Sequence, residues 1–193
     1  MNYLKLMQSK KPYAVIYNEM PVKLQRESYH LCWKYNLTDP DKTKLRRQIL
    51  NQLFNGKSKV MVNSPFHCDY GFNIRFQGFA FLNYGGVILD TSPVTIGNGA
   101  MITPHVVIAC SGHPVNYRQR IKGVMISKPI TIGDHVWIGA DTFINGGVKI
   151  GNHSVIGAGS TVTRSIPSDV VAFGSPCRAR RRITKQDLIN RIY

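Results

Sequence analysis

His113 is the histidine whose surroundings best suit proton transfer. It lies in the segment Ser111-Gly112-His113-Pro114, at the start of a polar and basic stretch that interrupts a regular pattern of aliphatic residues. An imidazole titrates near neutral pH and can take the proton of an attacking hydroxyl group, which accelerates a reaction by about 10²–10⁴-fold. The alternative is an ordinary loop histidine that makes one hydrogen bond. For a lone histidine that alternative would be favoured, and it is the Gly-His-Pro-Val context within the repeat that leads us to predict that His113 is a general base.

The charge of the chain indicates an anionic partner. Among 193 residues, 25 are lysine or arginine and 10 are aspartate or glutamate, so the formal net charge is +15. Such an excess attracts nucleic acid, an anionic membrane or a phosphate-bearing small molecule. The basic residues lie mostly at the two ends without a nucleic-acid-binding motif, and no apolar run is long enough for a transmembrane helix. We therefore favour a phosphorylated cofactor over nucleic acid or a membrane, with a merely solubilising basic surface as the alternative.

The N-terminus and the cysteines favour a reducing compartment. The first residues, MNYLKLMQSKKPY, contain no apolar segment followed by a small-residue cleavage site, so a secretory signal is not expected. The four cysteines, Cys32, Cys68, Cys110 and Cys177, are widely spaced and form no CxxC pair. We predict free thiols without a disulfide framework or a structural zinc site, and a cytoplasmic protein.

A six-residue repeat must position these groups. Aliphatic side chains recur at every sixth position, and a small or β-branched residue stands two places before each. Neither a 3.6-residue helix nor plain strand alternation has this period, whereas a short strand followed by a corner does. Three such sides close a triangular coil of roughly 18 residues, and coils stack at roughly 4.8 Å. The strong positions are Ile132, Ile138, Ile144, Ile150, Ile156 and Val162 in one block and Ile96, Ile102 and Ile108 in another, with a weaker cycle at Phe76, Leu82 and Ile88.

The repeat divides the chain into three parts. Residues 59–175 are expected to form a parallel β-helix, and residues 110–129, between the two blocks, an excursion loop that carries His113. Residues 1–58 are expected to be a small helical appendage, because Thr38-Asp39-Pro40 has the character of a helix start and an apolar stripe follows it. Residues 176–193 are expected to form a basic C-terminal segment with a short helix packed on the β-helix.

Three further histidines test the alternative of a metalloenzyme, in which three imidazoles converge on zinc. His135 and His153 are 18 residues apart and should stack on adjacent coils, whereas His105 falls on a different side of the coil. We predict that all three are surface turn residues and that no metal is required.

Several segments together resemble the maltose and galactoside O-acetyltransferases of the hexapeptide-repeat superfamily. Hexads alone are typical of the superfamily, whereas the ordered set CDYGFNI, SGHPV, KPITIGDHVWIGA and GSPCRARR is far more specific. The segment YNLTDPDKTKLRRQILNQLF also matches, so the resemblance covers nearly the whole chain. It implies a mainly β fold with a left-handed β-helix and a homotrimer with active sites between subunits. It also implies direct transfer of an acetyl group from acetyl-CoA to a sugar hydroxyl.

The resemblance implies roles for residues on both substrates. Asn83 aligns with a residue that contacts the sugar, and Asp69 and Asp90 could bind hydroxyls or orient the base, although each could be a satisfied turn carboxylate. For acetyl-CoA, alanine backbones could meet the pantetheine amides and forked guanidinium groups could bind phosphate. A packing tryptophan and a solvated basic tail are the alternatives there. The matched cofactor positions are Met125, Trp137, Ala140, Ala158, Thr163, Arg164, Arg178 and Arg181.

One position departs from the galactoside branch of the family. Where that branch carries an acceptor-binding aspartate, this chain has Val15, two residues after Tyr13. The expected acceptor is a sugar of the maltose, glucose or galactoside type. Without this carboxylate, a non-sugar or lipo-oligosaccharide acceptor stays open as an alternative, as does a non-catalytic trimeric scaffold.

Overall fold

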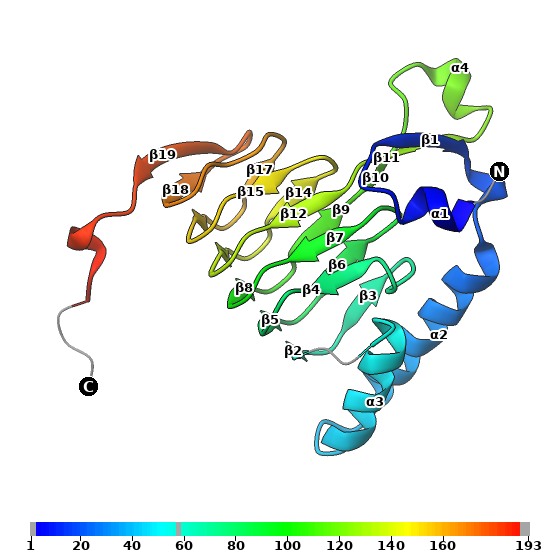
Figure 1. The fold of residues 1–193 in the computed structure, drawn as a ribbon, viewed down its shortest axis with the longest axis horizontal. Helices are drawn as coiled ribbons and strands as arrows, with labels where there is room; N and C mark the ends of the chain where they lie inside the picture. The colour runs from blue at the N-terminus through cyan, green and yellow to red at the C-terminus, as the bar shows by residue number, and fades with distance from the viewer. Residues whose placement is uncertain (1–2, 57–58, 190–193) are drawn as a thin grey trace.

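The computed structural model describes residues 3–56 and 59–189, and its main body is a stack of coils built from short parallel strands (Figure 1). The strands that build the coils are β2 (Val60–Val62), β3 (Phe66–Cys68), β4 (Ile74–Phe76), β5 (Ala80–Leu82), β6 (Gly86–Leu89), β7 (Val94–Ile96), β8 (Ala100–Ile102), β9 (Val107–Ala109), β12 (Ile130–Ile132), β13 (Trp137–Ile138), β14 (Phe143–Asn145), β15 (Lys149–Ile150), β16 (Val155–Ile156), β17 (Thr161–Val162) and β18 (Val170–Phe173).

Each coil adds one strand to each of three sheets. The four-stranded sheet has the order β15-β12-β7-β4, and the five-stranded sheet has the order β17-β14-β9-β6-β3. The seven-stranded sheet runs β18-β16-β13-β8-β5-β2, with β19 (Arg178–Arg182) added antiparallel at its end. Strands adjacent in the chain therefore never pair within these coils, and the architecture is the predicted parallel β-helix.

The aliphatic positions of the repeat fill the interior, as predicted. The side chains at the strong positions are at most 2% exposed, and Phe76 of the weaker cycle is partly buried against them. In the last coils Ile132 pairs with Ile150 and Ile138 with Ile156, which gives the predicted coil of 18 residues. Burial of each such side chain contributes about 1.5–3 kcal/mol, so the stack of isoleucines is the main source of stability.

The first coils are two residues longer, and the extra residues all fall at one corner. Ile96 pairs with Phe76 and Ile108 with Ile88, twenty residues apart. The added length lies where the chain passes from the five-stranded to the four-stranded sheet, and the excursion loop leaves the third coil at the same corner. We call the turns at residues 69–73, 90–93, 110–129, 146–148 and 163–165 the interrupted corner.

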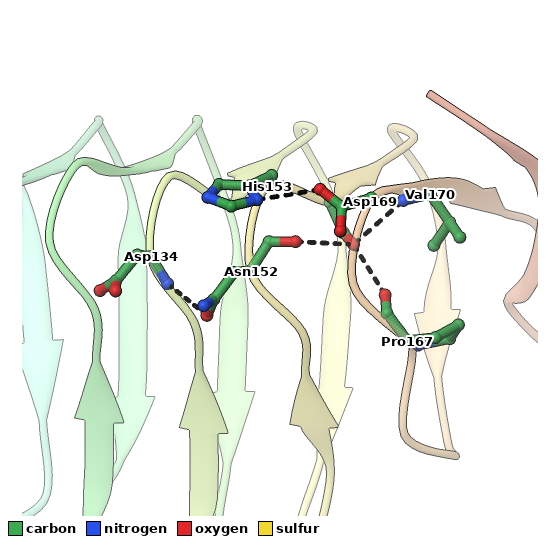
Figure 2. A network of polar contacts seen from close by, with 7 residues as sticks. Asp134, Asn152, His153, Pro167, Asp169 and Val170 are labelled. Atoms are coloured by element: carbon green, nitrogen blue, oxygen red, sulfur yellow. Dashed lines mark hydrogen bonds and ion pairs between the residues drawn. The ribbon is translucent and has the colours of Figure 1, made fainter. Parts of the chain in front are cut away.

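A second corner, between the four-stranded and seven-stranded sheets, keeps the period and satisfies its own polar groups (Figure 2). Asn98 Oδ1 accepts a hydrogen bond from the Phe79 amide (2.9 Å), Asp134 Oδ1 from the Asn98 amide (2.8 Å) and Asn152 Oδ1 from the Asp134 amide (3.0 Å). Each side chain thus binds the backbone of the preceding turn. We call the turns at residues 77–79, 97–99, 133–136, 151–154 and 167–169 the ladder corner.

Three histidines occupy exposed turn positions, as predicted, and the structure adds that their backbone is left-handed. The rings of His135 and His153 stack at the ladder corner with their centroids 6.0 Å apart, and His153 Nδ1 lies 2.9 Å from Asp169 Oδ1 (Figure 2). His105 lies between the seven-stranded and five-stranded sheets, with its Nδ1 3.3 Å from Asp141 Oδ1. All three histidines have a φ between 53° and 61°, which histidine tolerates better than bulky residues. They do not converge on one point.

The N-terminal part contains the predicted helices and one strand that was not predicted. Thr38 ends the second α-helix, where its Oγ1 donates to the Lys34 carbonyl (2.6 Å). The helix start placed at Thr38-Asp39-Pro40 is therefore wrong, and the next helix begins at Thr43. The boundary at residue 58 lies outside the described residues. The elements are α1 (Tyr3–Met7), β1 (Tyr13–Ile16), the 3-10 helix η1 (Tyr17–Glu19), α2 (Val22–Leu37) and α3 (Thr43–Leu53).

The excursion loop is ordered by a small antiparallel sheet. Its strands β10 (Ser111–Gly112) and β11 (Val124–Ser127) pair with each other, and β11 also pairs with β1. Between them, α4 (Tyr117–Arg120) projects away from the coils (Figure 1). The N-terminal part therefore holds the base of the loop.

The C-terminal segment is mainly a strand. The basic run 178–182 is β19, which covers the edge of the seven-stranded sheet through β18, and an exposed strand edge is commonly covered in this way. The predicted short helix packed on the β-helix is not found in residues 183–189: the segment has only the three-residue 3-10 helix η2 (Lys185–Asp187), which buries no residue. Residues 190–193 lie outside the described part. None of the helices in residues 3–56 and 59–189 is long and apolar enough to cross a membrane.

Candidate active site

His113 follows β10 at the interrupted corner, with an exposed side chain. Its Nδ1 lies 3.4 Å from the Val124 carbonyl oxygen on β11. A carbonyl can only accept a hydrogen bond, so this contact favours the tautomer with its proton on Nδ1. The Nε2 lone pair then stays available, which is the state that a general base requires.

The loop that carries His113 is tied to itself by Arg120. The Arg120 Nη1 donates to the carbonyl oxygens of Pro114 (2.9 Å) and Val115 (2.5 Å), the two residues directly after His113. Asn116 caps α4, since its Oδ1 accepts from the Arg118 amide at 2.9 Å. Arg120 therefore fixes the backbone on the C-terminal side of His113, a role that the sequence patterns did not predict.

Asp69 lies at the same corner, directly after β3, and is half-buried. Its Oδ1 accepts hydrogen bonds from Gln25 Nε2 (3.1 Å) and from the Tyr29 hydroxyl (3.4 Å), both on α2. Burial raises the pKa of the Asp69 carboxyl, and these two donors oppose that rise. The predicted acceptor residue thus has a polar site with neutral partners.

Asp90 is placed differently, and we correct its assignment as an acceptor contact. Its side chain is completely buried, with Oδ1 accepting from the Tyr70 amide (2.8 Å) and Oδ2 from the Asn73 amide (3.3 Å). Burial raises the pKa of Asp90 to about 7. Both oxygens hold the turn that carries Asp69, so Asp90 supports the site from inside and does not face a ligand.

Met125 is also buried rather than exposed to a cofactor. Its side chain is 2% exposed and lies in a cluster with Tyr13, Val15 and Tyr70. Val15 on β1 pairs directly with Met125 on β11. The Met125 side chain is therefore not exposed to a ligand within a single chain, which leaves its backbone for the predicted contact with acetyl-CoA. The same cluster connects the turn of Asp69 to the strand that contacts His113. Tyr70, which follows Asp69, lies in the cluster, and Val124, which contacts His113, directly precedes Met125 of the cluster.

Three other predicted residues gather at the third corner, between the seven-stranded and five-stranded sheets. Asn83, Ala140 and Ala158 lie there on different coils, and the Gly159 amide donates to the Ala140 carbonyl (2.8 Å) to connect two of them. A Cβ atom added at Gly159 would meet nothing within 4 Å, so this end of the corner is open. Asn83 Oδ1 accepts from Asn63 Nδ2 (3.0 Å), and its own Nδ2 has no acceptor among the described residues. The third corner therefore offers polar and backbone groups to a ligand, but it is not the corner of His113.

Trp137 lies on the outer face of the seven-stranded sheet with its ring 48% exposed. It pairs with Met101 on one side and Val155 on the other. Phe81 and Met61 extend the same outward row over the first coils. The row is a continuous apolar stripe along one face of the molecule.

The predicted phosphate ligands lie toward the C-terminal end. Thr163 and Arg164 are exposed at the interrupted corner, whereas Arg178 and Arg181 lie on β19. Arg178 Nη1 donates to the Cys177 carbonyl (2.7 Å). Arg181 makes a bidentate pair with Asp187 (2.8 and 2.6 Å), which lowers the pKa of Asp187 to about 2. Arg181 is thus already paired with a carboxylate, while Arg164 and Arg178 remain the better candidates for phosphate.

A cleft of about 540 Å³ lies between the N-terminal helices and the first coil, away from His113. A smaller cavity of about 50 Å³ lies at the base of the excursion loop, lined by residues that include Gly112, Lys128 and Gly146. Neither of these two cavities is lined by His113, Asp69 or Asn83.

Several known proteins with similar sequences and structures are named as acetyltransferases. Residues 129–164 match the family model described as bacterial transferase hexapeptide (six repeats). The chain is 41% identical to the galactoside O-acetyltransferase of Escherichia coli, over 81% of this chain and 78% of that one. It is similar to the structure of a maltose O-acetyltransferase from Clostridium difficile, with 37% identity and a TM-score of 0.86 over 96% of this chain and 99% of that one.

A hexapeptide-repeat acetyltransferase from Vibrio cholerae, solved in complex with acetyl-CoA, has 32% identity and a TM-score of 0.87 over 96% of this chain and all of that one. Like these relatives, the chain described here is a left-handed parallel β-helix.

Proposed function

The chain belongs to the hexapeptide-repeat O-acetyltransferase family of the galactoside and maltose enzymes, and on that premise we propose that it transfers the acetyl group of acetyl-CoA to a sugar hydroxyl. The observation that carries the proposal is the state of His113. It is an exposed imidazole at the one corner where the repeat is broken, with its Nδ1 facing a carbonyl and its Nε2 free.

His113 acts as a general base in this reaction. Its Nε2 takes the proton of the acceptor hydroxyl while the oxygen attacks the thioester carbonyl carbon, so a carbon–oxygen bond forms. The carbon–sulfur bond then breaks, and the imidazolium returns the proton to the leaving CoA thiolate. The Val124 carbonyl keeps the ring oriented and stabilises the imidazolium through Nδ1. No acyl-enzyme is needed.

The third corner and the C-terminal arginines suit acetyl-CoA. Small residues at Ala140 and Ala158 let an extended pantetheine chain approach the backbone, and the open space at Gly159 supports this placement. Arg164 and Arg178 supply the charged donors for phosphate. The crystal structure of the Vibrio cholerae relative contains acetyl-CoA, and no protein metal ligand is used in this scheme.

The active site is assembled between copies of the chain, and a homotrimer is the simplest such assembly. His113 and Asn83 lie at different corners, at opposite ends of the strands of the five-stranded sheet. The exposed row of Met61, Met101 and Trp137 supplies an apolar face for association. This face borders the third corner, so a neighbouring copy placed on it would lie beside Asn83, Ala140 and Ala158 and could bring its own His113 there. Residence in the cytoplasm suits the four free cysteines.

The activity is tested by measuring the release of free CoA thiol from acetyl-CoA. The acceptors are maltose, glucose, a methyl galactoside and, as a non-sugar, chloramphenicol. We expect turnover with at least one of the sugars and none with chloramphenicol. If no acceptor reacts and acetyl-CoA does not bind in calorimetry, the chain is a scaffold and the proposal is wrong.

A further inference from the structure

Two buried cysteines contact each other where α2 packs on the first coil. Cys32 of α2 and Cys68 at the end of β3 are each 2% exposed, and their Sγ atoms lie 3.7 Å apart. Both are free thiols in this structure. A disulfide bond is about 2.05 Å long, so the two sulfur atoms must approach by roughly 1.7 Å to form one. Rotation of the two side chains and a small shift of α2 would bring them together.

The two thiols differ in reactivity, and their surroundings cause the difference. A hydrogen bond from the Cys68 thiol lowers the pKa of Cys32, against the opposing effect of burial. Burial raises the pKa of Cys68, whose Sγ also lies 3.4 Å from the Ser28 hydroxyl. Since the thiolate is the nucleophile, Cys32 suits the role of the attacking sulfur. Cys68 then suits the role of the second thiol, which completes a disulfide.

A small oxidant has a route to this pair. The cleft of about 540 Å³ beside the N-terminal helices is lined by residues that include Ser28 and Leu31 of α2. Leu31 directly precedes Cys32 in the chain, and the Ser28 hydroxyl contacts Cys68 Sγ. Ser28 thus borders both the cleft and the sulfur. A molecule as small as hydrogen peroxide can therefore reach the pair through a local opening beside α2.

The pair also lies beside a predicted acceptor residue. Cys68 directly precedes Asp69, whose Oδ1 accepts hydrogen bonds from Gln25 (3.1 Å) and from Tyr29 (3.4 Å) of α2. Cys32 follows Tyr29 by three residues and Gln25 by seven, so all three lie on one face of the helix. A bond between Cys32 and Cys68 would therefore fix this face of α2 to the turn of Asp69.

We infer that Cys32 and Cys68 are an oxidation site, at which hydrogen peroxide converts the two thiols into a disulfide that locks α2 to the turn of Asp69. This inference goes beyond the proposed function and does not depend on it.

The reaction has two steps, which together consume one peroxide and release two waters. The Cys32 thiolate attacks one peroxide oxygen, so a sulfur–oxygen bond forms, the oxygen–oxygen bond breaks and the leaving hydroxide takes up a proton. The Cys68 sulfur then attacks the sulfenic acid on Cys32. A sulfur–sulfur bond forms, the sulfur–oxygen bond breaks, and the leaving hydroxide takes the Cys68 proton. The thiols lose two electrons to the peroxide, and a small dithiol can return them by thiol–disulfide exchange.

The experiment counts thiols in the folded, full-length chain. The reduced protein is treated with hydrogen peroxide, then denatured, alkylated and digested with trypsin, and the peptides are identified by mass spectrometry. We expect a cross-link between the peptides of residues 27–34 and 60–75, which contain Cys32 and Cys68, and dithiothreitol should remove it. The melting temperature should rise by roughly 5–15 °C on oxidation, because the disulfide closes a long loop of the unfolded chain.

Three variants assign the roles. Cys32→Ser and Cys68→Ser should each abolish the cross-link and the rise in melting temperature. In Cys68→Ser the sulfenic acid has no thiol to react with, so dimedone, which traps sulfenic acids, should label Cys32. The control is Cys110→Ser, in which a hydroxyl replaces the thiol that donates to the Ser92 carbonyl (3.4 Å), and it should form the wild-type cross-link. The wild-type cross-link decides the question even where a variant fails to fold.

A kinetic consequence rests on the proposed function. The approach of the two sulfur atoms shifts α2 and weakens its hydrogen bonds to Asp69, so oxidation should raise the KM for the sugar roughly threefold to tenfold. The KM for acetyl-CoA should stay the same, and dithiothreitol should restore the KM for the sugar.

Several results overturn the inference. It is wrong if the folded protein keeps all its thiols at a peroxide concentration that oxidises the urea-denatured chain, or if the cross-link joins Cys110 or Cys177 in place of this pair. Oxidation of Cys32 to the sulfinic acid without a cross-link also contradicts it. A sugar KM that is the same in the reduced and oxidised proteins removes the coupling to Asp69. If the cross-link forms but no sugar reacts in either state, the proposed function fails and the oxidation site stands.

Discussion

The ladder corner and the interrupted corner are built from the same six-residue repeat, and they differ in what their polar side chains bind. At the ladder corner, Asp134 and Asn152 accept hydrogen bonds from the backbone of the preceding turn. At the interrupted corner, Asp69 uses one carboxylate oxygen for side chains of α2, and His113 has a single long contact to a carbonyl. At the ladder corner the polar side chains bind the protein's own backbone. At the interrupted corner, Asp69 and His113 keep hydrogen-bonding groups that can bind ligands.

The largest effect should come from removing the base. We expect His113→Ala to lower kcat by about 10²–10⁴-fold, because the variant loses the imidazole that takes the proton of the acceptor hydroxyl. Acetyl-CoA affinity, measured by calorimetry, should stay close to that of the wild type. His67→Ala, which removes an exposed histidine from a coil strand, is the control. A His113→Ala protein with wild-type kcat would contradict the catalytic role that we assign to the interrupted corner.

The second prediction concerns the pH dependence of the free energy of unfolding. It tests whether Asp90, unlike Asp69, has a purely structural role at the interrupted corner. Its pKa is about 7 in the folded chain, against an ordinary 3.8. Between these values the folded state holds a proton that the unfolded state has lost, so the stability of the wild type falls as pH rises through this window. Asp90→Asn cannot titrate. From about pH 4 to about pH 7, the wild type should therefore lose roughly 4 kcal/mol relative to the variant.

Urea denaturation at a series of pH values measures this difference directly. Other titrating groups are common to both proteins and cancel in the comparison. Parallel stability curves for the two proteins would mean that Asp90 is charged throughout and is held by more than the two backbone amides.

A smaller effect is expected from Arg120, which ties the loop after His113. Arg120→Ala removes the donor to the carbonyls of Pro114 and Val115, so the imidazole loses part of its preorganisation. We expect kcat to fall roughly tenfold with both KM values unchanged. Arg120→Lys should restore part of the rate, because an ammonium can still reach a carbonyl. The control is Arg118→Ala, and an equal loss there would show that only the loop charge matters.

The smallest effect should come from the ladder corner. Asn152→Ala removes the acceptor for the Asp134 amide and should cost about 1 kcal/mol of unfolding free energy. The kcat of the folded protein should not change. Thermal unfolding and initial rates on the same preparations make the comparison. A fall in kcat without a fall in stability would contradict the assignment of this corner to structure alone.

The fold was predictable because its signal is periodic and local. In the coils of 18 residues, the aliphatic residue at every sixth position, such as Ile132, Ile138 and Ile144, marks the inward face of its strand. The two-residue additions at 69–73 and 90–93 were not predicted, since they break a cycle that was already weak. Strand β1 was missed for another reason: it pairs only with a segment more than a hundred residues away.

The candidate site was predictable in part. The break in the period singled out His113, and a motif match indicated Asp69. Neither signal shows whether the side chain of a predicted residue is buried or exposed. The burial of Asp90 and Met125 was not predictable, because it depends on the turn at 69–73 and on β1, which are remote in the sequence. The contact of Gln25 and Tyr29 with Asp69 was not predictable. The two residues are one helical turn apart, which does not indicate a site, and Asp69 lies some forty residues further along the chain.

The central claim is that His113 of one copy works with Asn83 at the third corner of its neighbour. Chains with His113→Ala and chains with Asn83→Ala, each with its own affinity tag, are co-expressed, and mixed assemblies are purified through both tags. In a mixed trimer one site in three combines an intact His113 with an intact Asn83, so we predict about one third of the wild-type rate, while each variant alone stays far below it. Mixed trimers no more active than either variant alone would contradict the claim and place both residues in the site of a single chain.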